Sequence, residues 1–241
     1  MKRTDIVMTE ELKSFLAFDL GHMKEDAFPN KRTDIPYCDD PELLMDIYYP
    51  EEKKDTYPVF LIVFGGGWIS GFRRSRFVEY MLKPLQMGYA CAVAQYPLSL
   101  DDTFPRPVID LKKAVDYLHT HAQELLLDTD NLTLWGESAG GHLALETALL
   151  PNERLGLTGL NTAVKNLVIF YPITDCDTID RYVKTEKDRH LRPDSVMGIF
   201  LASGLNDPQT LDLASPAHWI HPGMPRLWLQ HGTADRLVTP H

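Results

Sequence analysis

Residues 132–145, LTLWGESAGGHLAL, constrain the fold of this chain more than any other stretch. A predicted strand runs directly into Gly136, Ser138 and Gly140, in the pattern G-x-S-x-G, and a helical pattern follows. Glycines two residues to either side of a serine let the chain pass close to it in a sharp strand-to-helix turn. The helix N-terminus adds unpaired N–H groups and the positive end of its dipole. The pattern predicts an exposed nucleophilic serine; the alternative is a packing turn with an idle serine.

Short apolar runs separated by helical patterns occupy most of the chain after residue 40. Most runs are four to eight residues long and apolar on both faces, as in strands buried within a parallel sheet. The predicted strands are 43–50, 58–64, 89–96, 131–136, 166–171 and 225–231. The predicted helices are 10–18, 107–122 and 139–150. This alternation implies right-handed βαβ units and a helix-covered sheet in one α/β domain spanning 1–241.

Two segments interrupt this rhythm. The first 40 residues are polar and are interpreted as an irregular N-terminal extension with one short helix. Residues 172–224 are too long for a single crossover, so a cap-like insertion is expected there. One extra packed helix with loops is an equally open reading of that segment.

Composition excludes several classes of function. The net charge of −10 leaves no basic surface for nucleic acid or anionic lipid. Cys38, Cys91 and Cys176 are widely spaced and without a CxxC pair, so we expect reduced thiols and no metal site. No signal peptide and no membrane-spanning run is recognisable, which predicts a soluble, cytoplasmic protein.

A second glycine motif, VFGGGWISG at 63–71, follows the predicted strand 58–64. Three consecutive glycines leave backbone N–H groups unshielded at the end of a strand. An acyl-transfer enzyme needs such donors for the oxyanion of its tetrahedral intermediate. A flexible turn would be the default interpretation of this run by itself, but together with the serine turn it indicates acyl transfer.

From about residue 40 to its end, the chain resembles the α/β-hydrolase esterase and lipase group that includes hormone-sensitive-lipase-like and BD-FAE-type carboxylesterases. The resemblance rests on FGGGW, YPLSLDDTFPRPVIDLKKAVDYL, GESAGGH and HGTADRLV, in that order along the chain. It implies the α/β-hydrolase fold, with a mostly parallel central sheet and helices on both faces.

The same resemblance assigns roles by position. Ser138 matches the nucleophile and Asp235 the acid of the catalytic triad. The N–H groups that match the oxyanion hole belong to Gly66, Gly67 and Ala139. Trp68 and the 172–224 segment are expected to line the substrate pocket. The reaction implied is hydrolysis of short-acyl esters, including acetyl or feruloyl esters of plant glycans, without metal or cofactor and with a small-molecule ester as partner. An arylformamidase-like amidase and a catalytically impaired binding protein are the alternatives.

Three positions depart from the family pattern. Phe64 stands where the family has a histidine, and we expect it to brace the glycine loop by packing. Pro97 replaces an arginine. The triad histidine is expected roughly 25–40 residues beyond Asp235, after a further helix and strand, whereas only six residues follow.

His142 and His231 are interpreted as structural. Either His218 or His221 could face the cleft, but both belong to a segment that resembles the family's SPxHxI helix approach. His241 lies in the same loop as Asp235 and is a poor substitute for the triad base. Asp175 is an alternative acid. We therefore expect that the chain lacks its final strand and helix. The strand at 226–231 would then be an exposed apolar edge, covered by a homo-oligomer or prone to aggregation.

Overall fold

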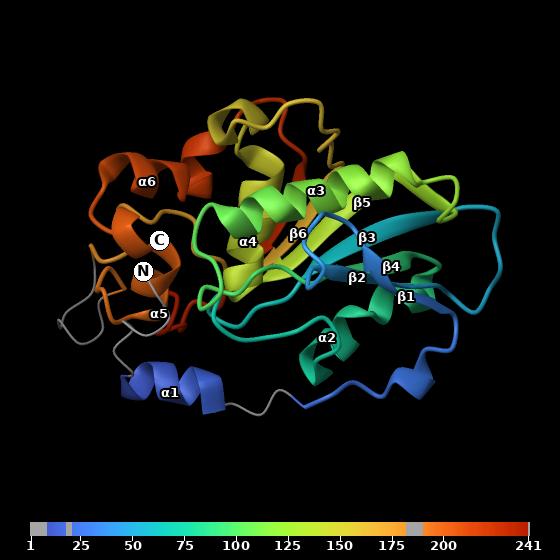
Figure 1. The fold of residues 1–241 in the computed structure, drawn as a ribbon, viewed down its shortest axis with the longest axis horizontal. Coiled ribbons are helices and arrows are strands. Elements are labelled where there is room, and N and C mark those ends of the chain that lie inside the picture. The colour runs from blue at the N-terminus through green and yellow to red at the C-terminus, as the bar shows by residue number, and fades with distance from the viewer. Residues whose placement is uncertain (1–8, 18–20, 182–189, 241) are drawn as a thin grey trace.

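The computed structural model of the protein describes residues 9–17, 21–181 and 190–240 (Figure 1). Its centre is a seven-stranded sheet in the order β1-β2-β4-β3-β5-β6-β7. The strands are β1 (Lys31–Pro36), β2 (Leu44–Tyr48), β3 (Tyr57–Val63), β4 (Ala90–Ala94), β5 (Leu127–Glu137), β6 (Asn166–Phe170) and β7 (Arg226–Gln230). The pairs β1–β2 and β2–β4 are antiparallel, and every later pair is parallel. The predicted mostly parallel sheet is therefore confirmed.

The apolar runs form the central strands because both of their faces are covered. All five residues of β4 are buried, and Val59, Leu61 and Val63 of β3 have no exposed surface. β5 begins earlier than the predicted 131–136, at Leu127, because residues 128–130 are polar and interrupt any apolar run.

The prediction of an irregular segment before residue 40 is wrong for β1. Its sequence, KRTDIP, is exposed or half-buried throughout, because β1 lies at the edge of the sheet. An exposed edge strand has no apolar face, so the sequence gives no period-two hydrophobic signal for it.

Two helices cover one face of the sheet, as Figure 1 shows: α3 (Arg106–Thr120) and α4 (Ser138–Leu149). Their first residues lie within one position of the predicted first residues, 107 and 139. This is the face toward which the Ile169 side chain of β6 points, because a Cβ placed on Gly141 of α4 would lie 3.3 Å from that side chain. On the opposite face, Tyr80 of α2 (Arg76–Met81) contacts Trp135, with ring centroids 6.4 Å apart. No helix in the described ranges is both long and apolar enough to cross a membrane.

The segment 172–224 contributes short helices near one end of the sheet. They are α5 (Val196–Leu201), η6 (Ala202–Gly204), α6 (Pro208–Leu213) and η7 (Pro216–Trp219). Ser195 caps α5 by accepting the Gly198 N–H at 2.9 Å. Phe200 of α5 stacks on Trp68, with ring centroids 4.5 Å apart, so this segment packs directly on the glycine loop.

The remaining helices are α1 (Glu10–Ala17), η2 (Glu25–Ala27), η3 (Lys83–Met87) and η4 (Asn152–Leu155). α1 packs over the glycine loop, because Leu12 is 1% exposed and forms an apolar cluster with Ile69 and Ile199. At the far edge of the sheet, Leu227, Trp228 and Leu229 of β7 are 40%, 65% and 47% exposed.

Candidate active site

Ser138 is the first residue of α4, at the point where β5 turns directly into this helix, and it has a φ of +50°. A positive φ is uncommon for a residue with a side chain and marks a strained turn. A Cβ on Gly136 would lie 2.3 Å from the Gly140 carbonyl oxygen, and one on Gly140 would lie 2.1 Å from the Val63 oxygen. Only glycine permits these approaches, which explains the spacing of the motif.

The glycine loop after β3 lies beside this turn. A Cβ on Gly65 would lie 3.5 Å from the Ser138 Cβ. The Gly66 carbonyl accepts from the Ile69 and Ser70 N–H groups at 3.2 and 3.0 Å, and from the Ser70 hydroxyl at 3.0 Å. Gly66 and Gly67 have φ values of +127° and +61°, and no acceptor among the described residues takes their N–H groups. The loop therefore leaves two backbone donors free next to the serine.

Phe64 supports the start of this loop by packing. Its ring stacks on Tyr96 with centroids 4.5 Å apart, and the Tyr96 hydroxyl donates to the Phe64 carbonyl at 2.8 Å. The prediction that Phe64 braces the loop by packing is confirmed.

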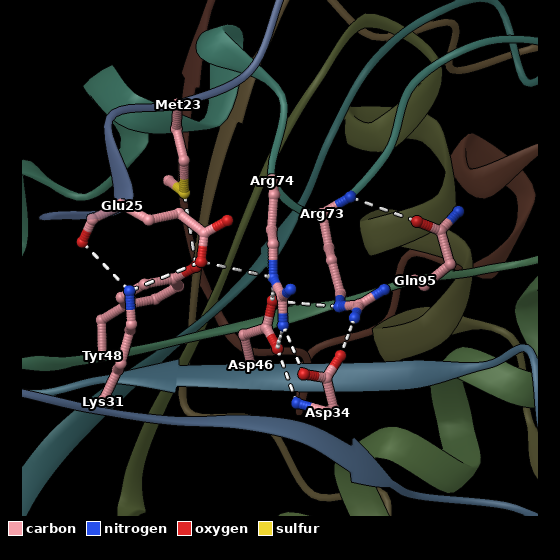
Figure 2. A network of polar contacts seen from close by, with 9 residues as sticks. All are labelled: Met23, Glu25, Lys31, Asp34, Asp46, Tyr48, Arg73, Arg74 and Gln95. Atoms are coloured by element: carbon pink, nitrogen blue, oxygen red, sulfur yellow. Dashed lines mark hydrogen bonds and ion pairs between the residues drawn. The ribbon is translucent and has the colours of Figure 1, made fainter.

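An ionic network around the buried Asp46 holds the far end of the loop, as Figure 2 shows. Asp46 of β2 has no exposed surface and accepts from Arg73 Nε at 3.0 Å and from Arg74 Nε at 2.7 Å. Both arginines also bind Asp34, and the Arg73 N–H donates to Gln95 Oε1 at 3.1 Å. The hydrogen bond from Arg74 lowers the pKa of Asp34. The loop is thus fixed to β2 by charge as well as by packing.

Ser138 borders two cavities of about 520 and 290 Å³. The larger cavity is lined by Ser14, Phe15, Phe64, Gly65, Gly66, Ser70, Gly71, Ser75, Phe77, Tyr80, Glu137, Ser138 and Tyr171. The smaller one is lined by Phe15, Gly67, Trp68, Ser138, Ala139, Ile173, His190, Ser195, Val196, Met197, Arg236, Leu237 and Val238. Phe15 of α1 also borders both cavities. Sequence reasoning missed this role of the N-terminal segment.

Glu137 precedes Ser138 and is 8% exposed at the wall of the larger cavity. Tyr80 and Tyr171 both donate to its Oε2 atom, Tyr171 at 2.6 Å. Burial raises the pKa of Glu137, against the effect of the Tyr171 hydrogen bond. Sequence reasoning missed this group, because the motif leaves the residue before the serine unspecified.

Asp235 lies in the loop after β7. Its Oδ1 accepts the Leu237 and Val238 N–H groups at 2.9 and 3.0 Å, and its Oδ2 lies 3.5 Å from His231 Nε2. His231 Nε2 also lies 2.7 Å from the Val238 carbonyl oxygen. The three residues after Asp235 line the smaller cavity with Ser138, whereas Asp235 itself lines neither cavity.

Several other residues considered for the catalytic triad form polar contacts with groups other than Ser138. His142 is fully buried, and its Nε2 lies 2.9 Å from the Ala214 carbonyl oxygen. Asp175 accepts a hydrogen bond from the Thr178 hydroxyl at 2.6 Å. Burial raises the pKa of Asp175, but the hydrogen bonds to its carboxylate outweigh burial, so the pKa is lowered. His218 lies between Asp212 and Asp175, with Nδ1 2.9 Å from Asp212 Oδ1.

His190 borders the smaller cavity together with Ser138, and no sequence motif marks this residue. Its Nδ1 lies 3.2 Å from Asp180 Oδ1 and its Nε2 lies 2.9 Å from the Leu237 carbonyl oxygen, so both ring nitrogens are engaged. Within the described ranges, no histidine is hydrogen-bonded to Ser138. His241 lies outside the described residues.

No metal centre emerges from the described residues, because no group of three or more His, Cys, Asp or Glu side chains is arranged to hold an ion. The three cysteines are free thiols, and Cys91 and Cys176 are buried.

The chain is similar to a known protein family and to several known esterases. The BD-FAE family matches residues 45–241. The chain is 28% identical to the probable carboxylic ester hydrolase LipM of Mycobacterium tuberculosis, over 76% of the chain and 42% of that protein. It is 26% identical to the esterase LipQ of the same organism, over 86% of the chain and 49% of that protein. The chain thus spans less than half the length of these two relatives.

Solved structures agree in fold. A Thermogutta terrifontis esterase superposes with a TM-score of 0.66 at 25% identity, covering 88% of this chain and 74% of the other. A truncated carbohydrate esterase from gut microbiota gives 0.74 at 22% identity, covering 90% and 82%. The observed sheet and these likenesses confirm the predicted α/β-hydrolase fold.

Proposed function

Because this chain belongs to the BD-FAE family, we propose that it hydrolyses carboxylic esters through an acyl-enzyme on Ser138. The observation that carries this proposal is the position of Ser138. It lies on a turn with positive φ, between two cavities and beside two free backbone N–H groups. A serine in this setting suits attack on a carbonyl carbon whose oxygen is then held by those donors.

The proposed reaction has two halves. The Ser138 oxygen bonds to the carbonyl carbon and gives its proton to an imidazole base, while the N–H groups of Gly66, Gly67 and Ala139 hold the oxyanion. The intermediate then expels the alcohol oxygen, which takes the proton from the imidazolium. Water attacks the acyl-enzyme by the same route and releases the acid and free Ser138.

Asp235 is the proposed orienting acid of that imidazole. Two backbone N–H groups fix its Oδ1, and Oδ2, which lies 3.5 Å from His231 Nε2, is the oxygen that we assign to the triad imidazole. The loop that follows Asp235 borders the smaller cavity, so the base that it orients would act there. Since the leaving oxygen must receive a proton from that base, we place the alcohol part of the substrate in the smaller cavity. The acyl part then occupies the larger one.

The proposed substrates are short-acyl esters, including acetyl or feruloyl esters of plant glycans. The larger cavity has an ordinary size for a ligand pocket, so an aromatic acyl group is compatible with it. Trp68 forms part of the wall of the smaller cavity, on the alcohol side.

A fluorophosphonate probe tests the proposal, because it bonds to an activated serine. We expect labelling of the wild type and none of Ser138→Ala.

Turnover of p-nitrophenyl acetate but not N-formylkynurenine would separate an esterase from an arylformamidase-like amidase. The second candidate function is a binding protein without turnover, favoured by the lack of a histidine on Ser138 among the described residues. Wild-type protein that resists the probe would refute the esterase proposal.

We also propose that a second copy covers β7. This strand is at the sheet edge, where its unpaired backbone groups and the exposed Leu227, Trp228 and Leu229 favour association. Light scattering should report a dimer or larger assembly that Trp228→Lys weakens. A wild-type monomer at high concentration would contradict it.

A further inference from the structure

Glu137 is a buried acid beside the nucleophilic turn that the proposed ester cleavage does not use. The residue is 8% exposed and lines the larger cavity with Ser138. A carboxyl group facing an apolar cavity is costly unless its oxygens are hydrogen-bonded. A carboxyl group at this position therefore requires hydrogen-bond donors for its oxygens.

The hydrogen bonds to Glu137 are unevenly distributed between its two oxygens. The hydroxyls of Tyr80 and Tyr171 both donate to Oε2. No donor among the described residues reaches Oε1. The tyrosines thus hold the carboxyl group in place from α2 and from the end of β6, and Oε1 remains as a fixed, unfilled acceptor.

The rest of the larger cavity is lined by aromatic rings and by small serine and glycine residues. Phe15 of α1, Phe64 of the glycine loop and Phe77 of α2 contribute to its wall. Among the polar groups of the wall, the Ser70 hydroxyl already donates to the Gly66 carbonyl at 3.0 Å. A ligand with an apolar body and one hydrogen-bond donor would satisfy both the rings and the free oxygen of Glu137.

We propose that Glu137 Oε1 accepts a hydrogen bond from a hydroxyl group on the acyl part of the substrate, so that the enzyme selects hydroxylated acyl esters. This inference rests on the proposed function, which places the acyl part in the larger cavity. A site built to hydrogen-bond a hydroxyl discriminates strongly against the analogue without it, because the buried acceptor is then left unpaired. Glu137 is a specificity-determining residue in this role.

Binding to Ser138→Ala protein tests the inference without turnover. Two matched pairs of ethyl esters are titrated by calorimetry: hexanoate against 6-hydroxyhexanoate, and 3-phenylpropanoate against 3-(4-hydroxyphenyl)propanoate. We expect at least one hydroxylated ester to bind about tenfold more tightly or better than its plain partner. The preference should vanish in Glu137→Leu, which offers the hydroxyl neither an acceptor nor a donor, while affinity for the plain ester changes less than about threefold.

Tyr171→Phe is the matched control, because it removes one donor to Oε2 and leaves Oε1 in place. It should retain the preference. Equal binding within both pairs, or equal loss for both members of a pair in Glu137→Leu, would overturn the inference. A Glu137-dependent preference for a 2-hydroxyethyl over an ethyl ester of the same acid would also overturn it, because the hydroxyl would then be read on the alcohol. The acyl preference can persist in the binding experiment while the wild-type protein shows no hydrolysis that depends on Ser138. That result would refute only the proposed function.

Discussion

Asp46→Asn removes the charge at the centre of the network that fixes the glycine loop to β2. Asp46 accepts four hydrogen bonds: from the Asp34 N–H at 2.8 Å, Arg73 Nε at 3.0 Å, and Arg74 Nε and Nη2 at 2.7 and 2.9 Å. An asparagine replaces one oxygen by a donor, so two of the four are lost whichever way the amide points. Two arginines then face a neutral, fully buried group.

The expected loss of stability is about 3 kcal/mol. Breaking a buried pair by removing one partner typically costs about 3–5 kcal/mol. The arginine side chains are 16% and 23% exposed and keep some water, which favours the lower end. Such a loss is a large fraction of the roughly 5–15 kcal/mol that stabilises a typical domain. Urea unfolding at pH 7, followed by tryptophan fluorescence, measures it as a shift in midpoint at constant slope.

Asp39→Asn is the matched control, because Asp39 is exposed and this substitution should change stability by less than about 0.5 kcal/mol.

The same network predicts a catalytic effect. If it positions the donors of Gly66 and Gly67, kcat for ester hydrolysis should fall while KM changes little, since those donors act on the transition state. A stability loss below about 1 kcal/mol would refute the assigned strength of the network. An unchanged kcat would refute its role in positioning the loop.

Two further substitutions test the turn and the buried histidine. Gly140→Ala should destabilise by about 3 kcal/mol or prevent folding, because its Cβ would lie 2.1 and 2.4 Å from two backbone oxygens. Gly232→Ala meets nothing within 4 Å and serves as the control; equal urea midpoints for the two variants would contradict the steric argument. Burial lowers the pKa of His142 from 6.5 to about 4, against its backbone hydrogen bond. Between these pH values the unfolded chain binds a proton that the folded chain does not, so stability falls as pH falls, by up to about 3 kcal/mol. His142→Gln should lack this contribution, and identical pH slopes in urea unfolding from pH 7 to 4.5 would exclude it.

Local sterics explain why part of this molecule could be predicted from its sequence. The turn at Ser138 requires glycines two residues away, because backbone atoms of β3 and α4 pass there within contact distance. The central strands carry continuous apolar runs because both their faces are buried, and that alone reveals them. Phe64 could be predicted to pack because a phenyl ring after a buried strand has no polar alternative.

Long-range contacts account for what the sequence left undetermined. The edge strand β1 has no apolar face to mark it, and Phe15 reaches both cavities only because α1 packs across the glycine loop. Likewise, nothing near Glu137 in the sequence indicates that Tyr80 and Tyr171 will meet at one of its oxygens.

The sequence by itself determined the apolar runs of the central strands and the strained serine turn, because each follows from residues within a few positions of one another. It also indicated the family, because several such local motifs occur in order along the chain. Tertiary structure alone decided which side chains surround that serine. It brought Asp46 to Arg73 and Arg74, His231 to Asp235, and an acid with one free oxygen to the cavity wall. Most of these contacts join residues tens of positions apart, and Asp235 and His231 face each other only because of how their loop folds after β7.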